Sequence, residues 1–414
     1  MEESHLATRA SAHPMAAERP LAQVRRSLVL IWSCGMALVA ASIALSWNGT
    51  PYWMDSTIYA RSVAEGGWAI HPPGHLFFVT AGRLLYACGY ADAYTALQVL
   101  TMLFTLGGVV LLYWLLRELV GPLESSILAV TFALSWVPLL MNHTGTSHAS
   151  DFVTVPLLLL AAARLTGRPT RASVWALTLA IVLCGGFRLT TLIMMSPLLV
   201  AVLWVNRHNA HVWGAGAVGG LMVGLAQLLV VHASGGWARY FFLAEKTHFI
   251  NRPFSVFHAG LDRLVLFNTG RSLLWFAAAT VGLWFALFRL RSPHPWSSRQ
   301  RLLLLYGALA TLGPLAVCTL YLCEHPGYLA PALAGFYLCL AVAWNRSAGR
   351  PGFAKWPAVA IVASLLLFFG LRYYREPATR GQAIANSVLL QYSADAARDA
   401  CYRTTTAWLI GTRR

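Results

Sequence analysis

Long apolar stretches alternate with short polar segments along almost the whole chain. Eleven of these stretches have about the length that a helix needs to cross a membrane, roughly 20 residues. This pattern predicts an all-α polytopic membrane protein with about eleven transmembrane helices. The predicted spans are residues 27–47, 93–116, 122–141, 151–166, 173–187, 191–206, 212–233, 271–289, 302–322, 328–345 and 356–373.

One further apolar stretch, residues 73–89, has an ambiguous pattern. It is short, it contains Arg83 and it is bracketed by glycine. We interpret it as an interfacial or re-entrant helix rather than as a span, because a charged side chain inside the hydrocarbon region is costly.

The composition supports a membrane protein and excludes a soluble one. Hydrophobic residues make up 57% of the 414 residues and charged residues only 11%, against about 25% charged residues in a typical soluble domain. The net charge of +16 does not indicate nucleic-acid binding, because the basic residues are scattered in short segments between spans. The seven cysteines form no CxxC motif and no cluster with histidine.

The basic residues also predict the orientation of the chain. Every short loop on one side carries Arg or Lys, for example RLTGRPTR at 164–171, whereas residues 142–150 and 323–327 on the other side carry none. The positive-inside rule therefore places the N-terminus inside and the C-terminus outside. We expect a cytoplasmic segment 1–26, a membrane body 27–374 with outer loops 48–92 and 234–270, and a short extracytoplasmic tail 375–414.

The first outer loop contains the strongest candidate for acid–base chemistry. Asp55, Tyr59 and Ser62 have helical spacing and share one face. An acidic side chain that faces a cavity there can act as a general base. Asp55 is the first candidate and Glu65 the second; the alternative is that both are solvated acids of a surface loop.

A basic side chain at the outer end of a span indicates a candidate anion site. Arg188 follows Gly-Gly-Phe there, and Lys246 and Arg252 in the large outer loop could assist it. The guanidinium group suits phosphate because it can bind two oxygens at once. The alternative is that Arg188 extends to the interface. The spacing of His143 and His148 matches no strong metal signature.

Several motifs resemble the GT-C superfamily of membrane glycosyltransferases, in particular the protein O-mannosyltransferase and aminoarabinose transferase branch. The similar segments are WMD after the first span, HPPGHLFF, the acid that opens the fourth span, GGFRLTTL, and EHPGYLAPALAG before the tenth span. Ser56 follows Asp55 where many relatives have a second acid, which argues against an acidic metal pair. Only a short tail stands where relatives often have a large C-terminal domain.

The resemblance implies a specific chemistry at the outer face of a plasma membrane of bacterial type. The donor would be a polyprenyl-phosphate sugar, and the acceptor hydroxyl, on an unknown protein, lipid or glycan, would be deprotonated by Asp55, with inversion. Arg188, aided by Lys246 or Arg252, would bind the lipid phosphate. No cofactor is expected. The implied substrate contacts are Glu65, His71, Asp151, Glu324, His325 and Tyr328.

The main alternative is a lipid or solute transporter, including a flippase. Such proteins also have many spans, but they usually show internal repeats and interrupted helices near the middle of the membrane. We find no internal repeat here, and the acidic residues collect at one face instead. These features argue against a transporter, and the resemblance implies a membrane-embedded hexosyl- or pentosyltransferase.

Overall fold

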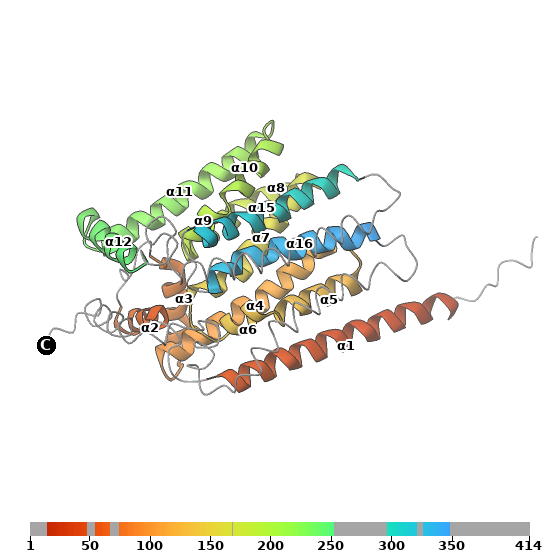
Figure 1. The fold of residues 1–414 in the computed structure, drawn as a ribbon, viewed down its shortest axis with the longest axis horizontal. Helices are drawn as coiled ribbons and strands as arrows, with labels where there is room; N and C mark the ends of the chain where they lie inside the picture. The colour runs from red at the N-terminus through yellow and green to blue at the C-terminus, as the bar shows by residue number, and fades with distance from the viewer. Residues whose placement is uncertain are drawn as a thin grey trace, which may run out of the picture.

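Long helices lying side by side form the body of the protein, and shorter helices gather at one end of it (Figure 1). The computed structural model describes residues 15–47, 54–66, 74–167, 169–251, 296–320 and 326–347. All secondary structure within these ranges is helical, which confirms the predicted all-α class. The predicted spans 271–289 and 356–373 and the tail 375–414 lie outside the described residues, so the number of spans stays a prediction.

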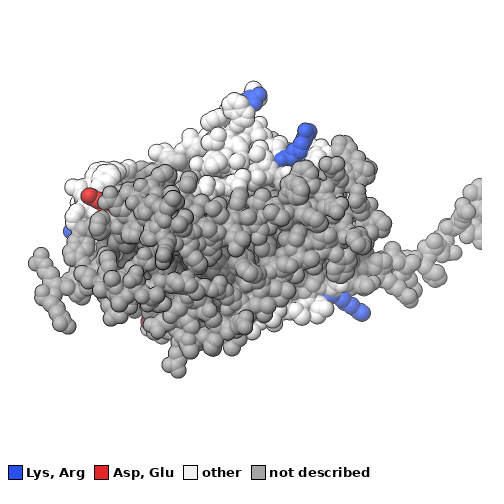
Figure 2. Space-filling model, viewed as in Figure 1, with Lys and Arg blue, Asp and Glu red and all other residues white. Residues whose placement is uncertain are grey.

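Five helical segments of the described chain are long and apolar enough to cross a membrane, as expected for an integral membrane protein. They coincide largely with α4 (Ala93–Arg117), α7 (Asp151–Gly167), α11 (Ala210–Ala233), α15 (Ser298–Leu320) and α16 (Ala330–Ser347). The predicted first span lies within α1 (Met15–Ser46), and α8 (Arg171–Phe187) is a shorter apolar helix beside them. The described surface visible in Figure 2 carries few charged side chains.

Two of the predicted spans are divided by proline. Residues 122–141 form α5 (Pro122–Ala133) and α6 (Trp136–Met141), and residues 191–206 lie in α9 (Leu189–Met194) and α10 (Ser196–Val205). The ring of a proline clashes with the carbonyl group four residues earlier. Pro138 therefore ends α5 near Leu134, and Pro197 ends α9 near Ile193. Each stretch is therefore a pair of helices rather than one continuous helix.

Helices too short to span the membrane lie together at one end of the bundle (Figure 1). They are α2 (Met54–Glu65) and α3 (Leu76–Ala87), each of 12 residues, and α12 (Trp237–Asn251). A 12-residue helix is about 18 Å long, against a hydrocarbon core of about 30 Å. The ambiguous stretch 73–89 is therefore a short helix, as predicted, whereas α12 was not predicted within the loop 234–270.

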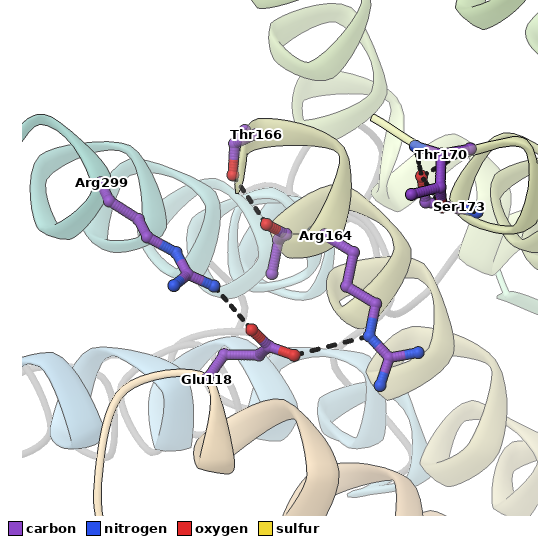
Figure 3. A network of polar contacts seen from close by, with 7 residues as sticks. Glu118, Arg164, Thr166, Thr170, Ser173 and Arg299 are labelled. Atoms are coloured by element: carbon purple, nitrogen blue, oxygen red, sulfur yellow. Dashed lines mark hydrogen bonds and ion pairs between the residues drawn. The ribbon is translucent and has the colours of Figure 1, made fainter. Parts of the chain in front are cut away.

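The opposite end of the bundle is held together by charged side chains (Figure 3). Glu118, just after α4, accepts hydrogen bonds from Arg164 of α7 at 3.4 Å and from Arg299 of α15 at 2.6 Å. These arginines belong to segments that the charge pattern places together on the inner side. The structure thus confirms that the segments share one end of the bundle.

The core is tightest where α4 crosses α7. Gly108 of α4 lies directly against the backbone carbonyl of Phe152 in α7, and a Cβ atom at Gly108 would collide with it. Leu112 and Leu158, on the same two helices, are fully buried. Because Phe152 directly follows Asp151, this contact also fixes the start of α7.

We expect Gly108→Ala to destabilise the protein by about 1–3 kcal/mol, because the added methyl group must push the two backbones apart. Gly220→Ala on α11 is the matched control, since a Cβ atom there meets nothing within 4 Å. That control should leave stability unchanged or raise it by about 0.5–1 kcal/mol. Thermal unfolding of both variants in one detergent measures the difference, and equal stabilities would contradict the packing argument.

Candidate functional site

A buried ion pair lies where the short helices meet the bundle. Asp151 is the first residue of α7, directly after the 3-10 helix η1 (Ser147–Ser150), and Arg188 separates α8 from α9 in an extended conformation. The guanidinium group of Arg188 donates to Oδ2 of Asp151, and the Thr191 hydroxyl donates to Oδ1 at 2.6 Å. The side chains of Asp151 and Arg188 are 0% and 2% exposed, so each charge depends on the other.

The glycine pair before Arg188 allows this arrangement. A Cβ atom at Gly186 would collide with the ring of Phe77 on α3. The close approach brings the start of α3 against the end of α8, where Nδ1 of His75 lies 3.0 Å from the carbonyl oxygen of Phe187. The segment GGFR therefore joins α3 to the ion pair.

Arg188 has hydrogen-bonding capacity beyond its bond to Asp151. Its buried Nε atom has no hydrogen-bond partner among the described residues. The guanidinium carbon lies 5.4 Å from the ring centroid of Tyr328, and that ring meets the ring of His148 edge to face at 4.7 Å. A buried N–H without a partner is costly unless a ligand satisfies it.

Helix α2 is attached to the loop that leads into Asp151. The hydroxyl groups of Tyr59 and Ser147 lie 3.2 Å apart, and Ser56 donates to the carbonyl oxygen of Thr144 at 2.7 Å. Tyr59 also packs edge to face against His75, with a centroid distance of 5.1 Å. Asp55, one turn before Tyr59, remains partly exposed. Residues 55–59 are therefore held against the segment that leads into Asp151, and Asp55 stays partly exposed.

Asp55 and Arg188 act electrostatically on the same hydroxyl group. Burial and, next, the negative charge of Asp55 raise the pKa of Tyr59 well above its usual value, while Ser147 and the positive charge of Arg188 oppose that rise. The tyrosine is therefore a neutral hydroxyl at physiological pH. The Tyr59 hydroxyl lies within the electrostatic range of both charges. The carboxylate of Asp55 and the guanidinium group of Arg188 therefore face one region of the molecule.

The loop 142–146 before η1 is buried, although its polar composition suggested an outer loop. Gln98 and Thr101 of α4 donate to the carbonyl oxygens of His143 and Asn142 at 2.9 and 3.1 Å. These bonds satisfy backbone groups that have no helical partner. Burial lowers the pKa of His143 to about 4, so this histidine is neutral and serves the packing of the loop.

The structure brings together only part of the residues that the sequence indicated. Asp55, Asp151, Arg188 and Tyr328 belong to the cluster. Glu65 does not: it is exposed and pairs with Arg61 at 2.8 Å on the surface of α2. Lys246 lies on α12, whose side chains are not described at that position, and His71, Arg252, Glu324 and His325 lie outside the described residues.

Several members of the cluster were missed by sequence analysis. Thr191 follows Arg188 by three residues, which is one helical turn, so its approach to the same partner was foreseeable. The contacts of Tyr59 with Ser147 and of His148 with Tyr328 join segments far apart in the chain, and no local signal predicts them. No group of three His, Cys, Asp or Glu side chains suited to a metal occurs among the described residues, which leaves the expectation of no cofactor untested.

The architecture has a counterpart among solved structures. The crystal structure of ArnT from Cupriavidus metallidurans bound to undecaprenyl phosphate superimposes with a TM-score of 0.54 at 16% identity, over 87% of this chain and 75% of that chain. The oligosaccharyltransferase of Archaeoglobus fulgidus gives a TM-score of 0.49 in its apo form and 0.45 with zinc and sulfate, at 14% and 15% identity. This chain covers 60% and 53% of those two chains. No protein-family model and no curated protein matches the sequence.

The likeness to ArnT concerns the fold. The chain has an arrangement of helices like that of ArnT, which is the kind of fold that the sequence motifs led us to expect. The other two likenesses are weaker and support no argument.

We predict that the ion pair is a strong constraint on stability. Asp151→Asn removes one charge and leaves Arg188 buried without its counter-ion, which should cost about 3–5 kcal/mol. The double variant Asp151→Leu with Arg188→Met should lie much closer to the wild type, because no charge is then left unpaired.

The exposed pair of α2 supplies the control. Arg61→Gln breaks the surface pair with Glu65 and should cost less than about 1 kcal/mol. Unfolding of all variants in one detergent gives the comparison. If Asp151→Asn were no more destabilising than Arg61→Gln, Asp151 and Arg188 would not depend on each other as described.

Proposed function

We propose that the protein is an integral membrane glycosyltransferase that moves a sugar from a polyprenyl-phosphate donor to an acceptor hydroxyl at the extracytoplasmic face. The observation that carries the proposal is that Asp55, a partly exposed carboxylate, lies on the helix that is bonded to the segment leading into Asp151, the partner of the buried Arg188. The Nε atom of Arg188 has no hydrogen-bond partner among the described residues. A glycosyl transfer of this kind needs a base on one side of the sugar and fixed positive charge on the other.

In this proposal, Arg188 receives the phosphate of the donor. Its bond to Asp151 fixes the guanidinium plane, and the Tyr328 ring at 5.4 Å supports it from another side. The free Nε–H group then donates to a phosphate oxygen. The negative charge that develops on the leaving phosphate meets a hydrogen-bond donor, the Nε–H group, that is already oriented. Little reorganisation is therefore needed in the transition state.

Asp55 acts as the general base. It takes the proton from the acceptor hydroxyl, whose oxygen attacks the anomeric carbon while the bond from that carbon to the phosphate oxygen breaks. Polyprenyl phosphate leaves with the bonding electron pair, and one direct displacement inverts the anomeric centre. Tyr59 and Ser56 hold α2 on the loop 142–147, so Asp55 keeps its position relative to Arg188.

The class of donor is supported by the fold. ArnT, with the same arrangement of helices, is described as bound to undecaprenyl phosphate, a polyprenyl phosphate. A lipid of this type has its phosphate at the membrane surface, where the cluster lies next to α2 and α3. The location of the site at the outer face of a bacterial plasma membrane remains part of the proposal. So do the contacts with donor or acceptor that are assigned to Lys246, Arg252, His71, Glu324 and His325.

A transporter or flippase would need a different placement of charge. Transport of a lipid headgroup requires polar contacts along a path through the membrane. The described ion pairs between helices lie instead at the two ends of the bundle, at Asp151–Arg188 and at Glu118 with Arg164 and Arg299. The remaining one, Arg61–Glu65, lies on the surface of α2. This separation favours chemistry at one face.

We expect Asp55→Asn to lower turnover by about 10²–10⁴-fold, the usual contribution of a positioned general base. The amide keeps the shape of the side chain and removes only its charge and basicity, so binding of the donor should persist. Turnover with a labelled polyprenyl-phosphate sugar and binding of the same donor are to be measured in one lipid.

Glu65→Gln is the matched control, since it neutralises an acid on the same helix that is exposed and paired with Arg61. It should lose much less turnover. Near-normal turnover in Asp55→Asn together with an inactive Glu65→Gln would identify Glu65 as the base instead. Full activity of both variants would overturn the proposed mechanism.

A further inference from the structure

A cavity lies between α8 and α11, and neither Asp55 nor Arg188 is among the residues that line it. Its volume is about 780 Å³, within the range of ligand sites. The residues that line it include the first turns of both helices and the apolar side chains of the next turns. Those used below are Arg171, Val174, Trp175, His211, Gly214 and Val218.

We propose that this cavity binds an anionic phospholipid from the leaflet at the arginine-rich end of the bundle. This is the end at which α8 begins, and the capping residues Thr170 and Ser173 of α8 appear in the same close view as the Glu118 cluster (Figure 3). The positive-inside rule makes this leaflet the cytoplasmic one. The site is therefore independent of the proposed sugar transfer at the other end.

The mouth of the cavity is basic. Arg171 and His211 are exposed and belong to its lining. Arg207 lies just before α11, with its guanidinium carbon 5.3 Å from the ring centroid of Trp204. No acidic side chain is among the residues of the described chain that line the cavity. Basic pockets between membrane helices on the cytoplasmic side are suited to anionic headgroups.

Two backbone N–H groups in the first turns of α8 and α11 already have hydrogen-bond partners, so the basic side chains are the groups that attract a phosphate. Thr170 accepts a hydrogen bond from the backbone N–H of Ser173 at 3.2 Å, and Asn209 accepts one from that of His211 at 3.1 Å. These first-turn amides are therefore already satisfied by protein. The guanidinium and imidazole groups remain as the donors for a phosphate.

The rest of the cavity is apolar and open to the lipid. Val174 is half-buried, while Trp175 and Val218 are 68% and 46% exposed. A Cβ atom at Gly214 would meet nothing within 4 Å, so this glycine leaves space between the helices. A phospholipid matches both parts, with its phosphate at Arg171 and His211 and an acyl chain along Val174 and Val218. A free phosphate would use only the first part.

The test is native mass spectrometry of the full chain in a neutral maltoside detergent, titrated with equal amounts of dioleoyl-phosphatidylglycerol and dioleoyl-phosphatidylcholine. The wild type should retain the anionic lipid in preference. The double variant Arg171→Gln with His211→Gln should lower its affinity several-fold, because an arginine near an anionic headgroup contributes to binding and the imidazole N–H donor is lost as well. Gly214→Leu fills the cavity without a change of charge and should lower affinity as well.

Two control variants separate the cavity from the general surface. Arg301→Gln removes an exposed basic residue from α15, and Gly220→Leu adds the same side chain to α11 where a Cβ atom meets nothing within 4 Å. Both should bind phosphatidylglycerol like the wild type, and all variants are to be checked for unchanged unfolding temperature.

Three results would overturn the proposal. One is equal retention of the two lipids by the wild type. Another is an effect of Arg301→Gln or Gly220→Leu as large as that of the cavity variants. The third is displacement of the lipid by soluble glycerol phosphate, which would make the cavity a site for a small phosphate compound. Loss of sugar transfer in Asp55→Asn has no bearing on any of these measurements.

Discussion

The buried ion pair of Asp151 and Arg188 is the constraint on which the arrangement of this end of the molecule depends. Two charges with side chains 0% and 2% exposed are stable only together, so the start of α7 and the junction of α8 with α9 must meet. The Thr191 hydroxyl satisfies the second carboxylate oxygen. The Nε atom of Arg188 has no hydrogen-bond partner among the described residues, and this donor makes the ion pair a candidate anion site.

The helices around the ion pair hold the two parts of the candidate site, Asp55 on α2 and Arg188 between α8 and α9. Gly186 lets α3 approach α8, and the contact of Tyr59 with Ser147 holds α2 above the loop that leads into Asp151. Asp55 is thereby fixed at the accessible edge while Arg188 stays buried. At the other end, Glu118 joins the basic segments that follow the positive-inside rule. The proposed chemistry and the segments predicted to be on the inner side thus lie at opposite ends of the described bundle.

Apolar periodicity and loop charge predicted the helical class, a short helix within 73–89 and the grouping of the inner loops, because these depend on local hydropathy and charge. The breaks in the helices near Pro138 and Pro197 could have been predicted from the prolines themselves, but a count of hydropathy along the chain takes no account of proline. For the site, the types and positions of Asp55, Asp151, Arg188 and Tyr328 were foreseeable. Their pairing was not, since the bond of Arg188 to Asp151 and the ring contact with Tyr328 join segments that only the packed bundle brings together.

The most direct test of the central claim is incubation of the purified protein with labelled polyprenyl-phosphate sugars and a mixture of envelope acceptors, followed by measurement of the free polyprenyl phosphate that is released. The account predicts that at least one sugar donor releases lipid phosphate with stoichiometric appearance of the sugar, inverted, on an acceptor. Movement of intact donor between leaflets of a vesicle, with no lipid phosphate released from any donor, would contradict it and indicate a transporter.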